Sequence, residues 1–469
     1  MTVTIIFAAF LLMSASFTLV DWRRGWLLAI LCGVLQDPAR KLTPGTPVIM
    51  SISVVLIYVV VIFAAQVTLQ RYGHEFTRRF PAIYGALILV FFFLFLAAVN
   101  GLVTFGIGQW KAPAMSFFLY LAPLPAVIIG YAFLQREEQL FGLFRFYAVV
   151  TSIAMIGTPL EYFRVNWRAL GTVAIGENLR FMTGLSIRLL SGFYRAPDIM
   201  GWHAALLTMI GVIMAVRVRS FRSGWIWMLV AGWGFVNCLI SGRRKALYMV
   251  AVFTVIFLWR YFRRLSTTQA VSFAVLAVVM MFVTAKISQN EESSVYTKAA
   301  YTTQEELWGR LEGGLSGTVE QTGIMGAGLG TATQGVYHVL RENSSTALGW
   351  QEGGLGKLAI ELGIPGLLAV ALLGLTMFLT MLKISAHPDV PGSSQLARAA
   401  LFGIIVANVV EFMVSAQAYS DPLLALLTAF FVGCTFATAA LDERLAEAEA
   451  ATNAPTAPRK TPLTSAATA

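Results

Sequence analysis

The chain has 469 residues, of which 57% are hydrophobic and only 12% are charged, and its mean hydropathy is +0.72. A soluble domain carries roughly a quarter charged residues, so this composition excludes a string of soluble domains. The formal net charge of +10 sits in short segments between apolar runs, without a basic patch interleaved with aromatic residues, which argues against nucleic acid as a partner.

Apolar segments of about the length that crosses a bilayer recur along the chain. Each is expected to be a helix, because an open strand in lipid leaves backbone groups unpaired. The second segment is too short to cross alone and could pair with the first as a re-entrant hairpin, so we expect about 12 or 13 spans. The segments lie at 3–20, 25–36, 47–66, 81–103, 116–134, 139–159, 199–216, 224–241, 245–262, 268–286, 356–383, 396–416 and 421–440.

The predicted fold class is therefore an all-α polytopic membrane helical bundle with a long, partly helical outer loop. Its orientation follows from loop charge, because the most basic segments alternate correctly to share the cytoplasmic side: 71–80, 217–223 and 260–266. The predicted parts are N-terminal membrane helices at 1–159, a first outer loop at 160–198, central helices at 199–286, a long outer loop at 287–354, C-terminal helices at 355–440 and a disordered cytoplasmic tail at 441–469.

The three cysteines, Cys32, Cys238 and Cys434, lie in apolar stretches far from any loop. Their odd number argues against a disulfide framework, and none forms a CxxC metal pair. We therefore expect no metal site built on cysteine pairs. The N-terminus has no basic region ahead of its apolar run, so it is interpreted as a first span and not as a removable signal.

One basic turn falls on the outer side of this topology. The stretch "SGRRKALY" holds Arg243, Arg244 and Lys245 in succession. Basic residues on that side need another reason to be there, and an anionic ligand is the usual one. A guanidinium presents a planar fork of donors that matches a phosphate. The alternative is that the topology is wrong by one span.

Further arginines approach a membrane span from the first outer loop. Arg188 and Arg195 lie in "RLLSGFYRAPDIMGWHAAL", close to Asp198 and a Pro-containing turn. They are candidates for binding the same anion. The alternative is a contact with a lipid headgroup, which is the commonest role of an arginine at an interface.

The long outer loop and the span after it carry the other candidates. His338 follows a glycine-rich run and could take a proton from an attacking hydroxyl, although a packing role is at least as common. Glu352 lies at the mouth of the next helix, as a candidate base or a helix cap. Lys357 and Glu361 are four apart, hence on one helical face, where they can neutralise each other as a supporting pair.

These segments together resemble the O-antigen ligase and polymerase superfamily of bacterial inner-membrane glycosyltransferases, mainly over residues 180–385. "RRKAL", with Arg243 and Leu247, is similar to that family's Arg-x-x-x-Leu motif, and "RLLSGFYRAPDIMG" resembles its Arg-containing, Gly-Phe turn before a span. "GIMGAGLG" resembles its Gly-x-Gly segment, and "LAIELGIPGLL" is similar to its Glu-x-Gly-Ile-x-Gly-Leu span start. The chain departs from the family pattern where a His-Asn pair is expected, because Glu352 and Gly353 stand there.

The resemblance implies transfer of a glycan from undecaprenyl diphosphate to an acceptor hydroxyl, on the periplasmic side of the inner membrane, without a metal, another cofactor or a nucleotide sugar. Arg243, with Arg244 or the two outer-loop arginines, would hold the diphosphate. Either Glu352 or His338 would serve as base. The acceptor would be a growing glycan for a polymerase or lipid A core for a ligase, and a chain-length regulator is a candidate protein partner.

Two other interpretations remain open. A peptidoglycan polymerase of the shape-and-division type uses the same carrier, but its acidic motif is not evident in this sequence. A transporter without chemistry would place ionisable residues at mid-span in broken helices. Nearly all charges lie at span ends, with Glu411 and Arg145 as exceptions, and the long outer loop favours chemistry over transport.

Overall fold

The computed structural model describes residues 2–173, 178–180, 186–218, 221–261, 316–333, 336, 353–386 and 395–453, together with five isolated positions between 265 and 280. Within these residues the regular secondary structure is helical apart from one small antiparallel sheet, in which Leu179 pairs with Ile187. Nine of the described helices are long and apolar enough to cross a membrane, or ten if a bent pair counts as one span. The predicted all-α polytopic bundle is confirmed.

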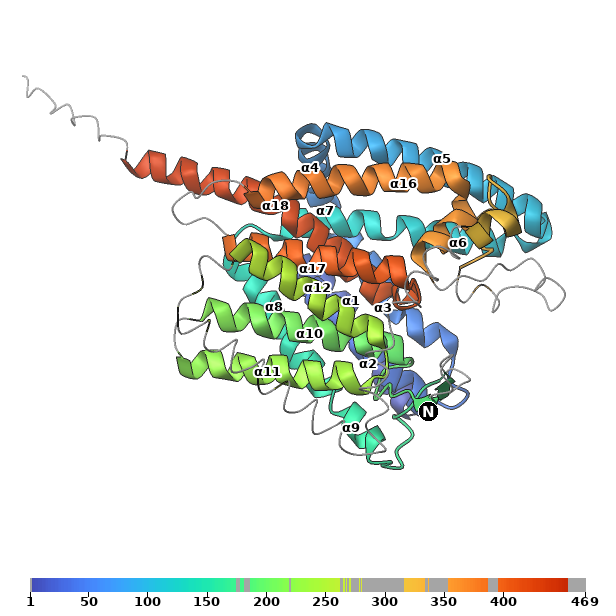
Figure 1. Ribbon diagram of the computed structural model, residues 1–469, viewed down its shortest axis with the longest axis horizontal. Helices are drawn as coiled ribbons and strands as arrows, with labels where there is room; N and C mark the ends of the chain where they lie inside the picture. Colours follow the sequence, from blue (N-terminus) through green and yellow to red (C-terminus); the bar gives the residue numbers. More distant parts are fainter. Residues whose placement is uncertain are drawn as a thin grey trace, which may run out of the picture.

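The helices lie largely side by side (Figure 1). The N-terminal part contains α1 (Thr2–Val20), α2 (Trp22–Leu42), η1 (Val48–Ile52), α3 (Ser53–Ala64), α4 (Gln66–Arg79), α5 (Pro81–Phe105), η2 (Ile107–Gln109), α6 (Lys111–Leu121), α7 (Pro123–Phe133), α8 (Glu137–Ala154) and α9 (Gly157–Tyr162). The rest contains β1 (Asn178–Arg180), β2 (Ser186–Arg188), α10 (Pro197–Arg217), α11 (Phe221–Ile240), α12 (Arg244–Tyr261), α16 (Gly354–Ala386), α17 (Gln395–Val414), η6 (Ala418–Ser420) and α18 (Pro422–Asn453).

The centre of the bundle is α10. In its most apolar window 94% of the residues are buried, against 22% in α5 and in α16. A helix that is hydrophobic all round is enclosed by other helices, and α10 indeed packs against α8, α11, α12 and α17. In Figure 1, α5 and α16 pair along one edge of the molecule, where an apolar surface suits contact with lipid.

Small residues allow the closest helix contacts, as is common between membrane helices. A Cβ atom at Gly211 of α10 would lie 2.6 Å from the backbone nitrogen of Ala231 in α11. A Cβ at Gly433 of α18 would lie 1.8 Å from the carbonyl oxygen of Val127 in α7. Any side chain at these two positions would therefore force the helix pairs apart.

The second segment differs from its prediction. Helix α2 has 21 residues, about 31 Å at 1.5 Å per residue, so it is longer than the apolar run at 25–36, but it is not among the described helices that are apolar enough to cross a membrane. The apolar run ends at 36 because polar side chains follow, but Gln36, Asp37 and Lys41 are buried and the helix continues through them. Their partners come from distant parts of the chain, which the apolar pattern does not reveal.

The C-terminal tail also differs in part. Helix α18 continues to Asn453, so the prediction that disorder begins at 441 is wrong for residues 441–453. This stretch, "LDERLAEAEAATN", is rich in Ala, Leu and Glu, which favour helix strongly. Glu443 also forms an ion pair with Arg79 of α4. Residues 454–469 lie outside the described part of the chain.

Candidate anion-binding site

The turn between α11 and α12 brings the predicted basic residues to one end of the bundle. Gly242 has φ 71°, a left-handed conformation that glycine adopts without strain, and it lets the chain reverse. The hydroxyl of Ser241 accepts a hydrogen bond from the backbone N–H of Arg243 at 3.0 Å. Helix α12 then begins at Arg244, so Arg243 and Lys245 project from a rigid corner.

Two cations share one carboxylate there, and we call Arg243, Lys245 and Asp198 the Arg243 cluster. The Nη2 atom of Arg243 lies 2.9 Å from Oδ2 of Asp198, and Lys245 forms an ion pair with the other oxygen of Asp198. Asp198 lies in the first turn of α10, where exposed N–H groups favour a carboxylate. The three side chains are mostly buried and carry a surplus of positive charge.

The end of α17 completes the surroundings of the Arg243 cluster. The Nζ atom of Lys245 donates to Oγ of Ser415 at 2.5 Å and to Oε1 of Gln417 at 3.2 Å. The Nε atom of Arg243 is buried and makes no hydrogen bond to any described residue. A buried guanidinium N–H without a partner is a donor that an anionic ligand can use.

Glu411 of α17 interacts electrostatically with both Lys245 and Asp198. Its side chain is buried, and among the described residues neither carboxylate oxygen has a hydrogen-bond partner. The sequence marks Glu411 as an exception because its charge interrupts an apolar span. In the structure, Glu411 lies next to the Arg243 cluster.

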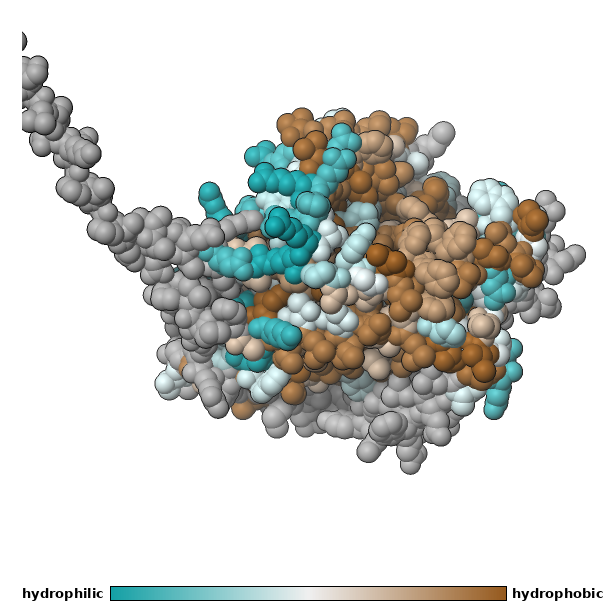
Figure 2. Space-filling model, turned by 90° about the horizontal axis from the view of Figure 1, so that it is seen from above, coloured by the Kyte–Doolittle hydropathy of each residue, from teal (hydrophilic) through white to brown (hydrophobic). Residues whose placement is uncertain are grey.

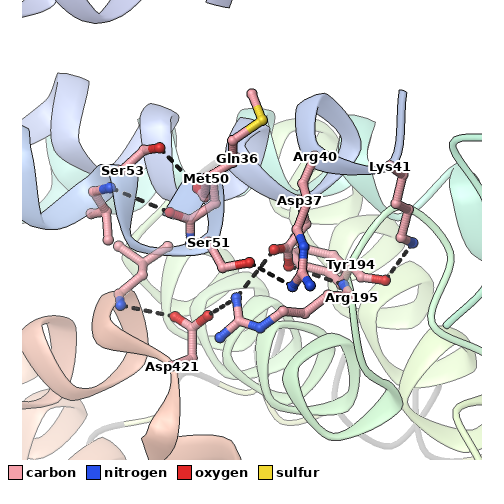
Figure 3. A network of polar contacts seen from close by, with 12 residues as sticks. Gln36, Asp37, Arg40, Lys41, Met50, Ser51, Ser53, Tyr194, Arg195 and Asp421 are labelled. Atoms are coloured by element: carbon pink, nitrogen blue, oxygen red, sulfur yellow. Dashed lines mark hydrogen bonds and ion pairs between the residues drawn. The ribbon is translucent and has the colours of Figure 1, made fainter. Parts of the chain in front are cut away.

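Arg195 has a different environment, shown in Figure 3. Its Nη1 atom lies 3.1 Å from Oδ1 of Asp37 and 2.6 Å from Oδ2 of Asp421, and its backbone N–H donates to Oδ2 of Asp37 at 2.9 Å. Burial alone would lower the pKa of Arg195, but the two carboxylates raise it above its ordinary value. Arg195 thus joins α2, the start of α10 and the start of α18, and its charge is more than matched.

Buried charged side chains also hold the turn before Arg195, which contains Ser191, Gly192 and Tyr194. Lys41 of α2 donates to the carbonyl oxygens of Gly192 at 2.9 Å and Tyr194 at 2.6 Å. Glu161 of α9 accepts from the backbone N–H groups of Ser191 at 3.0 Å and Gly192 at 2.6 Å. The Gly-Phe turn singled out in the sequence is therefore fixed by buried charges on both sides.

The remaining predicted arginines lie near these two groups. Arg188 ends β2 and interacts electrostatically with Glu161, on the side of the Arg195 network. Arg244 is the first residue of α12 and is partly exposed, next to the Arg243 cluster. The four predicted diphosphate-binding arginines are thus divided between two networks.

Both predicted bases, Glu352 and His338, lie outside the described residues. The described chain resumes at Gly353, where a Cβ atom would lie 3.2 Å from the carbonyl oxygen of Met413. At Gly354 a Cβ would lie 2.4 Å from the carbonyl oxygen of Phe412. The start of α16 therefore packs against the end of α17, which leads into Ser415.

Glu361 does not form the predicted pair with Lys357, because no ion pair joins these two residues in the described structure. Glu361 is fully buried, and the ammonium of Lys357 lies 5.6 Å from the ring centroid of Tyr120. The carboxylate instead accepts hydrogen bonds from Thr333 at 2.5 Å, Tyr120 at 2.6 Å, Gly330 N at 3.1 Å, Ser116 at 3.3 Å and Ala332 N at 3.3 Å. The carboxylate of Glu361 is therefore stabilised by five hydrogen-bond donors from two distant segments, and not by the nearby lysine.

These donors hold the glycine-rich segment between α5 and α16. Ala327 N donates to Ile360 O at 2.7 Å, and Leu329 N donates to Ala97 O at 2.9 Å. Gly328 has φ 95°, and a Cβ there would lie 2.2 Å from the backbone nitrogen of Gly101. The glycines singled out in the sequence thus serve close packing of this segment against membrane helices.

In the described part of the chain, no group of three or more His, Cys, Asp and Glu side chains is arranged to hold a metal ion. No protein-family model matches the chain, and no curated protein matches it either. The resemblance to the O-antigen ligase and polymerase superfamily therefore stays a prediction based on its motifs.

Proposed function

We propose that the protein is a membrane glycosyltransferase that transfers a glycan from undecaprenyl diphosphate to an acceptor sugar hydroxyl, on the periplasmic face of a bacterial inner membrane. The observation that carries this proposal is the Arg243 cluster. Two cations share one carboxylate, and Arg243 keeps a buried N–H that no described residue accepts. Fixed positive groups of this kind stabilise the charge that develops on a departing diphosphate.

The reaction needs one bond made and one broken. The acceptor oxygen attacks the anomeric carbon, the bond between that carbon and the diphosphate oxygen breaks, and its electron pair leaves with the diphosphate. The hydroxyl proton passes to a base, for which we propose Glu352, with His338 as the second candidate. Glu352 directly precedes Gly353, whose contact with the end of α17 supports this choice.

The test is an assay in vesicles or nanodiscs with an undecaprenyl-diphosphate oligosaccharide as donor. We expect Arg243→Ala to slow release of undecaprenyl diphosphate by about 10²-fold, as loss of one charge-stabilising donor does elsewhere. Lys111→Ala is the matched control, because Lys111 is an exposed cation outside the cluster. A folded Arg243→Ala protein with the wild-type rate would disprove the proposal. Two acceptors distinguish the two kinds of enzyme. A polymerase should extend lipid-linked oligosaccharide, and a ligase should transfer the glycan to lipid A core.

A transporter of lipid-linked glycan is the second candidate, and Glu411 favours it. A buried carboxylate without a hydrogen-bond partner inside a membrane helix is typical of proton or substrate pathways. The same vesicles distinguish the two functions, since a transporter moves the donor across the bilayer and leaves its glycan unchanged. A peptidoglycan-type disaccharide-peptide donor in the same assay tests the remaining enzymatic alternative.

A further inference from the structure

Helix α4 lies across the end of the bundle opposite the Arg243 cluster. It follows α3 at a bend of 78°. Phe76 anchors it, with its ring centroid 5.5 Å from that of Tyr131 in α7 and 5.4 Å from that of Phe436 in α18. A helix that leaves a membrane span at such an angle and buries one face against other spans is suited to lie along the membrane surface.

The opposite side of α4 has two parts. Val67, Arg71, His74 and Arg78 follow one another at i, i+4, i+7 and i+11, so they share one side of the helix, and all four are exposed. We call these residues the α4 face. Val67 is 73% exposed and Phe63, at the end of α3, is 69% exposed. The α4 face is therefore apolar where it joins the span and cationic farther along.

The cationic part lines an open cavity of about 600 Å³. Its two carboxylates are already engaged, since Glu75 accepts from the hydroxyl of Tyr131 at 2.9 Å and Glu443 pairs with Arg79. Arg71 and Arg78 form no ion pair with any residue that the structure describes. Figure 2 shows a hydrophilic patch beside a broad hydrophobic surface on the side of the molecule where α4 and α5 lie.

We infer that the α4 face binds the headgroup of an anionic phospholipid. The phosphate lies between Arg71 and Arg78, whose planar donor forks match its oxygens. The acyl chains run beside Val67 and Phe63 toward the surface of α3. A free phosphate would use the two arginines but would leave the exposed apolar residues unexplained, whereas a lipid uses both parts. The basic-loop pattern assigns this end to the cytoplasmic leaflet, where anionic lipids attract basic segments next to spans.

The inference is tested by native mass spectrometry of the full chain, delipidated in detergent and titrated with phosphatidylglycerol or phosphatidylcholine. We expect one phosphatidylglycerol to bind about ten-fold more tightly than phosphatidylcholine. The double variant Arg71→Gln/Arg78→Gln should lose this preference. Arg222→Gln, an exposed arginine outside the cavity, should keep it.

Three results would overturn the inference. They are unchanged phosphatidylglycerol binding by the double variant, equal binding of the two lipids by the wild type, and displacement of the lipid by millimolar inorganic phosphate. The last result would identify a site for a free anion. The variant Arg71→Lys/Arg78→Lys guards against a folding artefact, because it keeps both charges and should retain more of the preference than the glutamine variant.

Discussion

The Arg195 network and the Arg243 cluster use the same types of side chain in opposite proportion. Arg195 lies between two carboxylates, those of Asp37 and Asp421. In the other cluster the carboxylate of Asp198 is shared by two cations. A cation matched by two carboxylates has no net positive charge to offer an anion, whereas a surplus of cations around one carboxylate can accept one.

The backbone shows the same difference. The N–H of Arg195 donates to Asp37 in α2, so the path of the chain into α10 depends on this contact. The N–H of Arg243 donates to Ser241 within its own turn, and its Nε atom lacks a partner in the described structure. Two arginines that look equivalent in the sequence are therefore assigned different roles, one in stability and the other in ligand binding.

The largest expected effect is on stability. Arg195→Met removes the cation that pairs with the buried carboxylates of Asp37 and Asp421, and breaking a buried ion pair in this way typically costs about 3–5 kcal/mol. We expect a marked fall in the unfolding temperature of the purified protein and a lower yield in the membrane. Lys111→Met should change neither. An Arg195→Met protein that unfolds at the wild-type temperature would show that the network does not hold these helices together.

Next in size is the effect of Arg243→Ala on turnover. The rate should fall about 10²-fold, equivalent to about 2.7 kcal/mol of transition-state stabilisation, while the unfolding temperature stays close to that of the wild type. In cells the lipid-linked donor should accumulate, as it should in a Glu352→Ala variant. If Arg243→Ala destabilises the protein as much as Arg195→Met does, the distinction between the two clusters fails.

Sequence patterns predicted the helix ends well where the polar residues that follow an apolar run are exposed to solvent or lie at the membrane interface. The segment expected at 81–103 is α5 (Pro81–Phe105), and that expected at 199–216 is α10 (Pro197–Arg217). The pattern failed at α2, because Asp37 and Lys41 are polar yet buried. Their partners, Arg195 and the carbonyl oxygens of the turn before it, are more than 150 residues away, and no local window contains them.

The candidate site shows the same limit. Three successive basic residues drew attention to the turn at 243–245, but their carboxylate, Asp198, comes from the start of a different helix. Asp421 could have been recognised as a helix cap before Pro422, though not as a partner of Arg195. For Glu361 a local rule suggested Lys357, whereas tertiary packing supplied the hydroxyl and amide donors.

Glu361→Gln tests that correction and should have a smaller effect. An amide offers one acceptor oxygen and places an NH₂ group among donors, so some of the five hydrogen bonds are lost, at about 1–3 kcal/mol for the buried groups left unpaired. We expect faster amide hydrogen exchange at Gly330 and Ala332. Lys357→Gln should cost about 0.5–1 kcal/mol, the size of one cation–π contact. Equal effects of the two substitutions would point to a Lys357–Glu361 pair after all.

The smallest predicted effect on activity concerns Ser415, which positions Lys245 in the Arg243 cluster. Ser415→Ala removes one hydrogen bond to the ammonium, worth about 1.5 kcal/mol, so activity should fall about ten-fold with little change in unfolding temperature. If Lys245 contacts the diphosphate before reaction, the loss appears as a higher KM for the lipid-linked donor. Ser420→Ala, a nearby hydroxyl bonded within its own turn, is the control. An unchanged KM together with a lower kcat would restrict the role of Lys245 to the transition state, and unchanged kinetics would show that Ser415 is not part of the site.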